Sequence, residues 1–334
     1  MVYSLKRFAC HSRIIATIAL SLFVSIAIAP DCVFAQINSE IVVVQPDSEK
    51  STQRALKGFR KSIREYNSEI RIHLIELKTF SGSGRALCDS ILSLSPDVVV
   101  TIGSRTTEIV ASLIKDIPVI FCAVYHPLSS EHINSMEFPG GNVTGASLDI
   151  LPLIQFKYFK RLYPNLKRLG IIYSDKTAKI IPHAKIAANS CGLELVALEI
   201  PTGLNAISRQ KQTLKAFDSL LNRVEGIWSL ADPSVFSPTT TRLMIRKTVQ
   251  GHVPFMGFSA RIVKSGALFA LDMDFKDVGR QTGELTVRVL KGEDPGSIPI
   301  TRPGIIWFHF NRKTAKHIAA NIPEDLRTIA KGAH

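Results

Sequence analysis

The chain has 334 residues, 46% hydrophobic and 21% charged, with no low-complexity tract. This composition excludes a disordered protein, and the length suits two lobes of ordinary size, each with its own core. The net charge of +13 would suit nucleic acid or an acidic membrane surface. The basic residues are scattered along predicted helices, however, without aromatic residues between them. This pattern favours a solvated basic surface and no nucleic-acid partner.

The first 35 residues are typical of a secretory signal peptide. Three basic residues precede an apolar run over 14–29, and the small-residue pattern "VFA" ends at Ala35. We predict cleavage between Ala35 and Gln36, and hence export. A retained membrane anchor is the alternative, because the apolar run is close to the shortest length that spans a bilayer.

Three cysteines follow the predicted cleavage point, namely Cys88, Cys122 and Cys191. Their spacing does not match a metal site, and an odd number excludes a framework of disulfides. A single disulfide stays open. Cys122 lies inside an apolar run and is predicted to be a core residue.

After the signal, short β-branched runs alternate with helix-length amphipathic segments. The first series predicts strands over 41–45, 70–77, 97–103 and 117–124, with helices near 50–66, 84–94 and from about 105. The second series predicts strands over 168–174, 193–200, 226–230 and 253–258, with helices near 152–163, 178–191, 208–222 and 239–249. Apolar strands between helices are typical of a parallel sheet covered on both faces. The predicted fold class is therefore α/β, with two Rossmann-like lobes.

The last part of the chain predicts two further strand–helix pairs, over 266–292 and 304–320. One pair would complete the sheet of each lobe. Lobe 1 would then comprise 36–143 plus 268–298, and lobe 2 would comprise 144–267 plus 299–334. The chain would cross between the lobes more than once, and such crossings make a hinge around which a cleft can close.

Ligands of open parallel sheets bind beyond the carboxyl ends of the strands, where helices begin. The polar residues at these places are the candidate ligand-binding residues: Gln45, Ser104, Arg105, Thr106, Tyr125, His126, Ser174, Asp232, Ser259 and Asp274. The strongest group is "GSRT" at 103–106, because helix N–H groups, hydroxyls and a guanidinium would suit a carboxylate or a phosphate. The alternative is a plain helix cap by Ser104, with Arg105 in solvent.

The same residues give little support to catalysis or metal binding. His126 has no metal-type spacing around it and no carboxylate adjacent in the sequence to orient its imidazole. Asp232 and Asp274 could form a catalytic pair, but aspartates at strand ends cap helices or hold ligand amines at least as often. Because no nucleophile is paired with a base, we predict a protein that is not an enzyme and has neither a metal nor a cofactor.

The stretch "PGGNVTG" at 139–145 contains Asn142-Val143-Thr144, which matches an N-glycosylation acceptor. Its place between the two series of strands and helices favours another interpretation. The glycines let the chain leave the first lobe, and 142–144 would form the strand that crosses to the second. We therefore predict a hinge at Gly141, Asn142, Thr144 and Gly145.

Four segments together resemble a known family: 96–127, "PGGNVTGASLD" at 139–149, "LKRLGIIYSDKT" at 166–177 and 266–300. They are similar to the ABC-transporter substrate-binding proteins, whose members include tryptophan- and tyrosine-binding proteins, and the likeness runs in order from about 40 to 323. The resemblance implies a type I periplasmic-binding-protein fold with three crossovers. It also implies a monomer in the periplasm that holds a small ligand in its cleft and delivers it to a membrane permease.

The resemblance further implies that 103–106 hold a ligand carboxylate and that Tyr125 offers a stacking surface. The family often has an aspartate where this chain has His126, and a proline where it has Arg105. Loss of an acidic contact and gain of a cationic one predict a more anionic ligand, or one without a free amine. An aromatic amino acid stays open.

Three other functions are compatible with two such lobes. A sensory binding protein would report to a membrane kinase, and the neighbouring genes would distinguish it. A secreted enzyme on a Rossmann-like scaffold would turn its ligand over. A sugar-responsive repressor would need a helix-turn-helix where this chain has its predicted export signal.

Overall fold

The computed structural model describes residues 39–46, 49–80 and 84–334. The predicted signal peptide over 1–35 lies outside this part of the chain. No helix within the described residues is both long and apolar enough to cross a membrane.

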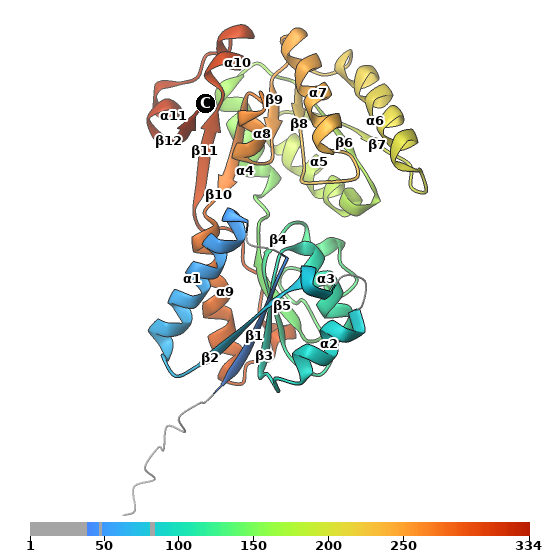
Figure 1. The fold of residues 1–334 in the computed structure, drawn as a ribbon. Coiled ribbons are helices and arrows are strands. Elements are labelled where there is room, and N and C mark those ends of the chain that lie inside the picture. Colours follow the sequence, from blue (N-terminus) through green and yellow to red (C-terminus); the bar gives the residue numbers. More distant parts are fainter. Residues whose placement is uncertain (1–38, 47–48, 81–83) are drawn as a thin grey trace, which may run out of the picture. The chain divides into compact units, whose positions relative to one another are not determined.

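The first sheet contains five parallel strands in the order β2-β1-β3-β4-β5 (Figure 1). Its strands are β1 (Glu40–Gln45), β2 (Arg71–Glu76), β3 (Val98–Ile102), β4 (Val119–Val124) and β5 (Val143–Ser147). The connecting helices are α1 (Lys50–Tyr66), α2 (Gly84–Leu92) and α3 (Ser104–Leu113), with the 3-10 turns η1 (Leu77–Phe80) and η2 (Pro127–Ser129).

Side chains of β1 alternate between two cores, as the period of a strand requires. Ile41 and Val43 belong to one cluster together with Phe59 of α1, whereas Val42 belongs to another together with Leu87 of α2. The sheet is thus covered on both faces, which explains why its strands read as continuous apolar runs.

The second sheet contains seven strands in the order β12-β11-β10-β9-β8-β6-β7, parallel except for the antiparallel pair β10/β11. Its strands are β6 (Arg168–Tyr173), β7 (Glu194–Glu199), β8 (Gly226–Trp228), β9 (Phe255–Gly257), β10 (Phe269–Met273), β11 (Ile306–Phe310) and β12 (Ala330–Ala333). Its helices are α4 (Pro152–Leu162), η3 (Asp175–Ile180), α5 (Ile181–Ser190), α6 (Ala206–Leu221), α7 (Pro238–Gln250), α8 (Ala260–Lys264), α10 (Arg312–His317) and α11 (Glu324–Ile329). The sequence did not predict α8, α11 or β12, which are short.

The last two strand–helix pairs do not divide between the sheets as expected. Strands β10 and β11 both join the second sheet, whereas helix α9 (Phe275–Leu290) returns to pack on α1 in the first lobe (Figure 1). A Cβ at Gly58 would lie 1.9 Å from the Lys276 carbonyl oxygen, and one at Gly279 would lie 1.9 Å from the Ala55 carbonyl oxygen. The two helices therefore cross backbone against backbone, which only glycine permits.

The lobe boundaries expected at 143/144 and 267/268 each differ from the observed ones by one strand. Strand β5 extends the first sheet, and β10 lies in the second. The chain crosses between the sheets three times: after Ser147, after Met273, and between η4 (Pro295–Ser297) and β11. Burial patterns identify strands but do not say which sheet receives them, so the pattern alone misplaced both boundaries.

The stretch predicted to be a hinge lies within the first sheet. Gly140 and Gly141 have positive φ values of 75° and 60° and make a turn before β5. The Asn142 side chain donates hydrogen bonds to the carbonyl oxygens of Ile114 (3.0 Å) and Ile117 (2.7 Å), which fixes this turn to the loop before β4. Residues 142–144 therefore do not form the crossing, which begins only after β5.

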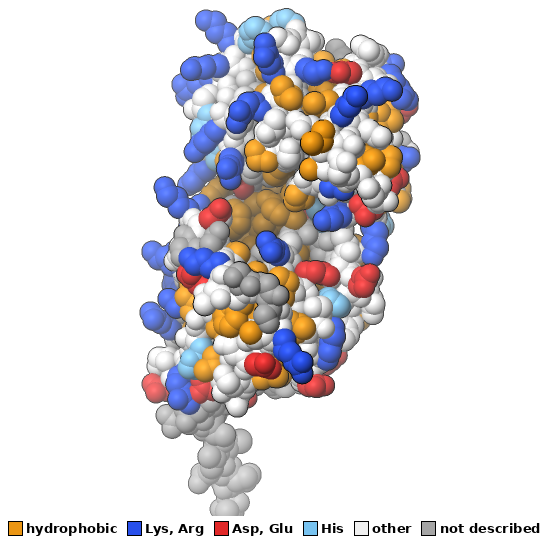
Figure 2. Space-filling view, turned by 45° about the vertical axis from the view of Figure 1, so that its right-hand side comes forward, with side chains coloured by type: hydrophobic (Ala, Val, Ile, Leu, Met, Phe, Trp, Pro, Cys, Tyr) orange, Lys and Arg blue, Asp and Glu red, His pale blue; other side chains and the backbone are white. Residues whose placement is uncertain are grey.

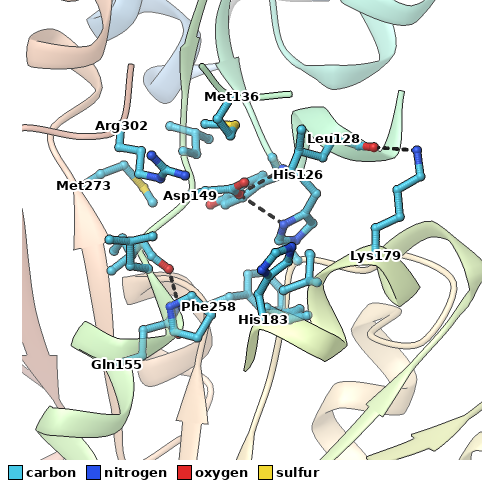
Figure 3. A pocket seen from close by; sticks show the side chains of 18 of the residues that line it. His126, Leu128, Met136, Asp149, Gln155, Lys179, His183, Phe258, Met273 and Arg302 are labelled. Carbon is cyan, nitrogen blue, oxygen red and sulfur yellow. Dashed lines mark hydrogen bonds and ion pairs between the residues drawn. The ribbon is translucent and has the colours of Figure 1, made fainter. Parts of the chain in front are cut away.

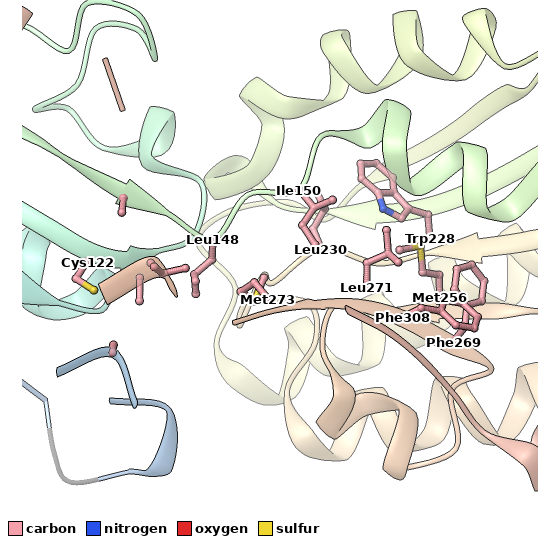
Figure 4. Close-up of a cluster of buried hydrophobic side chains, with 14 of the residues drawn as sticks. Cys122, Leu148, Ile150, Trp228, Leu230, Met256, Phe269, Leu271, Met273 and Phe308 are labelled. Atoms are coloured by element: carbon pink, nitrogen blue, oxygen red, sulfur yellow. The ribbon is translucent and has the colours of Figure 1, made fainter. Parts of the chain in front are cut away.

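The largest hydrophobic cluster runs from the first sheet through the crossing segments into the second sheet (Figure 4). Cys122 lies at one end, Leu148 and Met273 lie in or beside the crossings, and Phe269 lies at the other end. Cys122 is a buried core residue, as predicted, and burial raises the pKa of its thiol to about 12. Cys88 and Cys191 are also free cysteines.

Candidate ligand-binding site

A cavity of about 500 Å³ opens where the crossing segments meet both sheets, within the usual range for small-molecule sites. It appears in Figure 2 as a hollow lined by hydrophobic side chains. Its apolar lining residues are Leu128, Met136, Leu148, Ile150, Leu151, Pro152, Ile180, Leu230, Ala231, Phe258, Leu271 and Met273. Its polar lining residues are Tyr125, His126, Asn134, Ser135, Glu137, Asp149, Gln155, Lys179, His183, Ser229 and Arg302.

The central polar feature of the cavity is a contact between His126 and Asp149 (Figure 3). The His126 Nδ1 atom lies 3.1 Å from Asp149 Oδ1, and the His126 backbone N–H donates to the same oxygen at 2.9 Å. His126 has a left-handed backbone with φ of 53°, which turns its N–H and its ring toward one acceptor. The carboxylate that was absent beside His126 in the sequence is therefore supplied by Asp149.

The sequence analysis did not identify Asp149, although the rule that ligands bind beyond the carboxyl ends of parallel strands applies to it. Asp149 follows strand β5, so it is a polar residue beyond the carboxyl end of a strand. The sequence pattern assigned the strand at 142–144 to the crossing and not to the first sheet. It therefore did not identify Asp149 as a residue beyond the carboxyl end of a strand in that sheet.

Tyr125 links the cavity to the start of α3. Its backbone N–H donates to Ser104 Oγ at 3.2 Å, and its ring centroid lies 5.9 Å from that of His126. Burial raises the pKa of the Tyr125 phenol, and the carboxylates of Asp272 and Asp149 raise it further. Tyr125 therefore stays neutral, as a stacking surface requires.

The start of α3 has polar groups without partners. Gly103 precedes the helix with φ of 88° and no side-chain cap, so Ser104 is not the helix cap considered as the alternative. Within the described chain, Arg105 is exposed and forms no ion pair, and the buried Thr106 Oγ1 and Gln45 Oε1 have no hydrogen-bond partner. These free donors and acceptors lie at the ends of neighbouring strands β1 and β3.

The predicted residues of the second lobe have structural partners instead. Asp232 is 1% exposed, and its Oδ2 atom accepts from Ser174 N (3.0 Å), Ser174 Oγ (2.7 Å) and Thr177 Oγ1 (2.8 Å). Its Oδ1 atom accepts from Ser234 N at 2.9 Å. Ser174 and Asp232 therefore join the ends of β6 and β8 and do not line the cavity.

Ser259 and Asp274 also lie outside the cavity lining. Ser259 precedes α8 without capping it, and the N–H of Ala260 is taken by Asp272 at 2.8 Å. Asp274 caps α9 through Lys276 N (2.9 Å) and pairs with Arg54 at 2.7 Å. Asp274 thus caps a helix, as the alternative interpretation expected, whereas Asp232 links the ends of two strands.

Two contacts join the lobes beside the cavity. Lys179 Nζ of η3 donates to the carbonyl oxygen of Leu128 in η2 at 2.8 Å, and Ser129 Oγ donates to the carbonyl oxygen of Lys176.

On the floor of the cavity, Gln155 donates to the Ile150 carbonyl oxygen and accepts from the Trp228 indole N–H. In the part of the chain that the structure describes, no group of three or more metal-binding side chains is present.

The sequence matches a family of known proteins over most of its length. Residues 40–333 match the model of a family described as ABC transporter substrate binding protein. A tyrosine-binding protein from Clostridioides difficile (strain R20291) is 26% identical over 256 residues, which cover 75% of this chain and 72% of that protein.

Two solved structures show the same fold. One is the ABC domain from Streptococcus pneumoniae in complex with L-Trp, with 24% identity and a TM-score of 0.67 over 89% of this chain and all of that one. The other is a ligand-free, open substrate-binding protein with adhesive properties from Clostridium difficile. It has 18% identity and a TM-score of 0.70 over 88% of this chain and 99% of that one. The architecture of the present chain is that of the type I periplasmic binding proteins.

Proposed function

Because the chain belongs to the ABC transporter substrate-binding protein family, we propose that it is the solute-binding protein of an importer. It closes its two lobes around a small carboxylate, such as an amino acid, and delivers this ligand to a membrane permease. The family is one of binding proteins and not of enzymes. The observation that carries the proposal is the cavity of about 500 Å³, to which both lobes and the crossing segments contribute.

The ligand carboxylate binds at the start of α3 in this proposal. Free N–H groups at a helix start attract an anion. Arg105 is exposed there, and the buried Thr106 Oγ1 and Gln45 Oε1 atoms have no hydrogen-bond partner within the described residues. The apolar part of the ligand fills the cavity against Tyr125 and the aliphatic lining. The amino acids in the names of two relatives, tyrosine and tryptophan, support a ligand of this size.

Closure occurs at the crossings, which we place after Ser147, after Met273 and next to Arg302. These segments contribute Leu148, Ile150 and Arg302 to the cavity lining, so a ligand in the cavity contacts the hinge directly. The protein acts as a monomer in the periplasm, after removal of its signal peptide.

Mass spectrometry of small molecules released from the purified protein tests this function, followed by calorimetry with the released compound. We expect one small carboxylate per chain. A protein that carries no small molecule and binds none from a panel of amino acids and carboxylates would contradict the proposal.

A transport measurement separates the importer from the sensory alternative. If the protein serves an importer, deletion of its gene abolishes uptake of the released ligand. Normal uptake together with loss of a transcriptional response to the ligand would favour the sensory function.

A further inference from the structure

We propose that the cavity selects carboxylates that lack a free α-ammonium group, such as 3-arylpropanoates, 2-oxo acids and branched-chain fatty acids. The reason is that Asp149, the less exposed of the two carboxylates in the lining, already has the imidazole and backbone N–H of His126 at its Oδ1 atom, while the Arg302 guanidinium points toward it from the other side. This inference rests on the proposed function, because it specifies the class of ligand bound in the same cavity.

The hydrogen bonds of Asp149 are the first support. A carboxylate oxygen accepts about two hydrogen bonds, and Asp149 Oδ1 already receives the His126 N–H at 2.9 Å and faces His126 Nδ1 at 3.1 Å. The two side chains are only 24% and 11% exposed, so water does not readily replace this contact. An ammonium at Oδ1 would have to displace the imidazole.

The surrounding charges are the second support. In Figure 3 the Arg302 guanidinium points toward Asp149 from the side opposite His126. Lys179 and His183 also line the cavity. An ammonium would thus join a carboxylate that the Arg302 guanidinium already faces, and repulsion between these like charges raises the cost of its approach.

The imidazole itself does not offer the ammonium an alternative acceptor. His126 Nε2 is buried and has no hydrogen-bond partner within the described residues. A ligand in the cavity therefore does not reach it unless the ring moves away from Asp149.

Glu137 is the other carboxylate in the lining, and it is exposed in the loop before β5. Ion pairs at exposed positions contribute little, because water competes for both charges. Glu137 therefore does not replace Asp149 as the site for an ammonium. The rest of the lining is largely aliphatic, which suits an aromatic or branched body without further polar groups.

Calorimetry with matched pairs tests the inference. The pairs are L-phenylalanine and 3-phenylpropanoate, L-tyrosine and 3-(4-hydroxyphenyl)propanoate, and L-leucine and 4-methylpentanoate. Because a buried polar group without a partner is costly, we expect the deaminated acid to bind about tenfold more tightly than its amino acid in every pair that binds. An amino acid that binds more tightly than its deaminated partner would overturn the inference, while the proposed function would stand.

Variants then assign the selectivity to His126. His126→Ala frees Asp149 and should improve amino-acid binding about tenfold relative to the deaminated acid. The double variant His126→Ala/Asp149→Asn should lose this gain, and the control His317→Ala, at an exposed position outside the cavity lining, should leave the ratio unchanged. His126→Gln keeps a side-chain donor for Asp149, so it should retain the original preference if the alanine variant folds poorly.

Two results would count against this mechanism. If His126→Ala leaves the ratio of affinities unchanged, the imidazole does not set the selectivity. If neither member of any pair binds, the class of ligand is wrong. The proposed function would survive that second result if the purified protein releases a different small molecule.

Discussion

The strand ends of the two sheets carry similar polar residues but use them differently. In the second sheet, Asp232 accepts four hydrogen bonds, from Ser174, Thr177 and Ser234. In the first sheet, Gln45 Oε1 and Thr106 Oγ1 are buried without a partner in the described chain. Buried polar groups are normally paired. Asp232 in the second sheet follows this rule, whereas Gln45 and Thr106 at the strand ends of the first sheet do not, and our proposal assigns these unpaired groups to the ligand.

The largest effect is expected at Asp232 and tests whether its hydrogen bonds stabilise the fold. Asp232→Ala removes the acceptor for two hydroxyls and two backbone N–H groups, so we expect the free energy of unfolding to fall by about 3 kcal/mol. Urea titration followed by circular dichroism measures this change. The folded variant should keep its ligand affinity, because Asp232 does not line the cavity. A large loss of affinity with unchanged stability would reverse the assignment.

The edge of the first sheet beside the cavity should be rigid and not a hinge. A Cβ at Gly145 would lie 2.2 Å from the Phe121 carbonyl oxygen, so Gly145→Ala should destabilise the protein by about 2 kcal/mol. Gly141 has φ of 60° but no atom within 4 Å of a Cβ, so Gly141→Ala should cost only about 1 kcal/mol. Thermal unfolding of both variants measures the difference. Equal losses of stability would show that β5 is less tightly packed than the structure indicates.

The sequence predicted the order and type of most elements because their apolar runs and amphipathic helices are long. It also singled out Tyr125 and His126, which directly follow a buried strand and which line the cavity in the structure. It could not assign β5 or β10 to a sheet, because a buried strand looks alike in either one. The same limit concealed Asp149, whose contact with His126 joins residues 23 positions apart.

Substitution of an unpartnered polar group at the strand ends of the first sheet should change ligand affinity and not stability. Thr106→Val removes a buried hydroxyl that has no partner among the residues the structure describes, so the free energy of unfolding should stay the same or rise slightly. Affinity for the released ligand should fall about tenfold. The matched control is Thr101→Val, because Thr101 Oγ1 bonds to Thr107 Oγ1 at 2.8 Å. This control should lose about 1 kcal/mol of stability and little affinity, and calorimetry with thermal unfolding would distinguish the two variants.

His309 is the exception that limits the comparison. It belongs to the second sheet, is 7% exposed, and neither ring nitrogen has a partner among the described residues, yet it does not line the cavity. Burial lowers the pKa of His309, and burial also lowers the pKa of the neighbouring His334. An unpartnered buried polar atom therefore does not identify a ligand site by itself. Gln45 and Thr106 do not line the cavity either, so their assignment rests on the proposal that the ligand carboxylate binds at the start of α3.

The lowered pKa values predict a modest dependence of stability on pH. A histidine held neutral in the folded protein binds its proton more readily when unfolded, so stability is complete above the ordinary histidine pKa of about 6.5. It should decrease as the pH falls from there toward the lowered pKa of His309. Urea titrations from pH 7.5 to pH 5 would measure this slope. In His309→Phe the free energy of unfolding should change less with pH than in the wild type. The control His183→Ala, at an exposed position, should leave the pH dependence unchanged. An equal pH dependence in His309→Phe and the wild type would mean that other groups cause it.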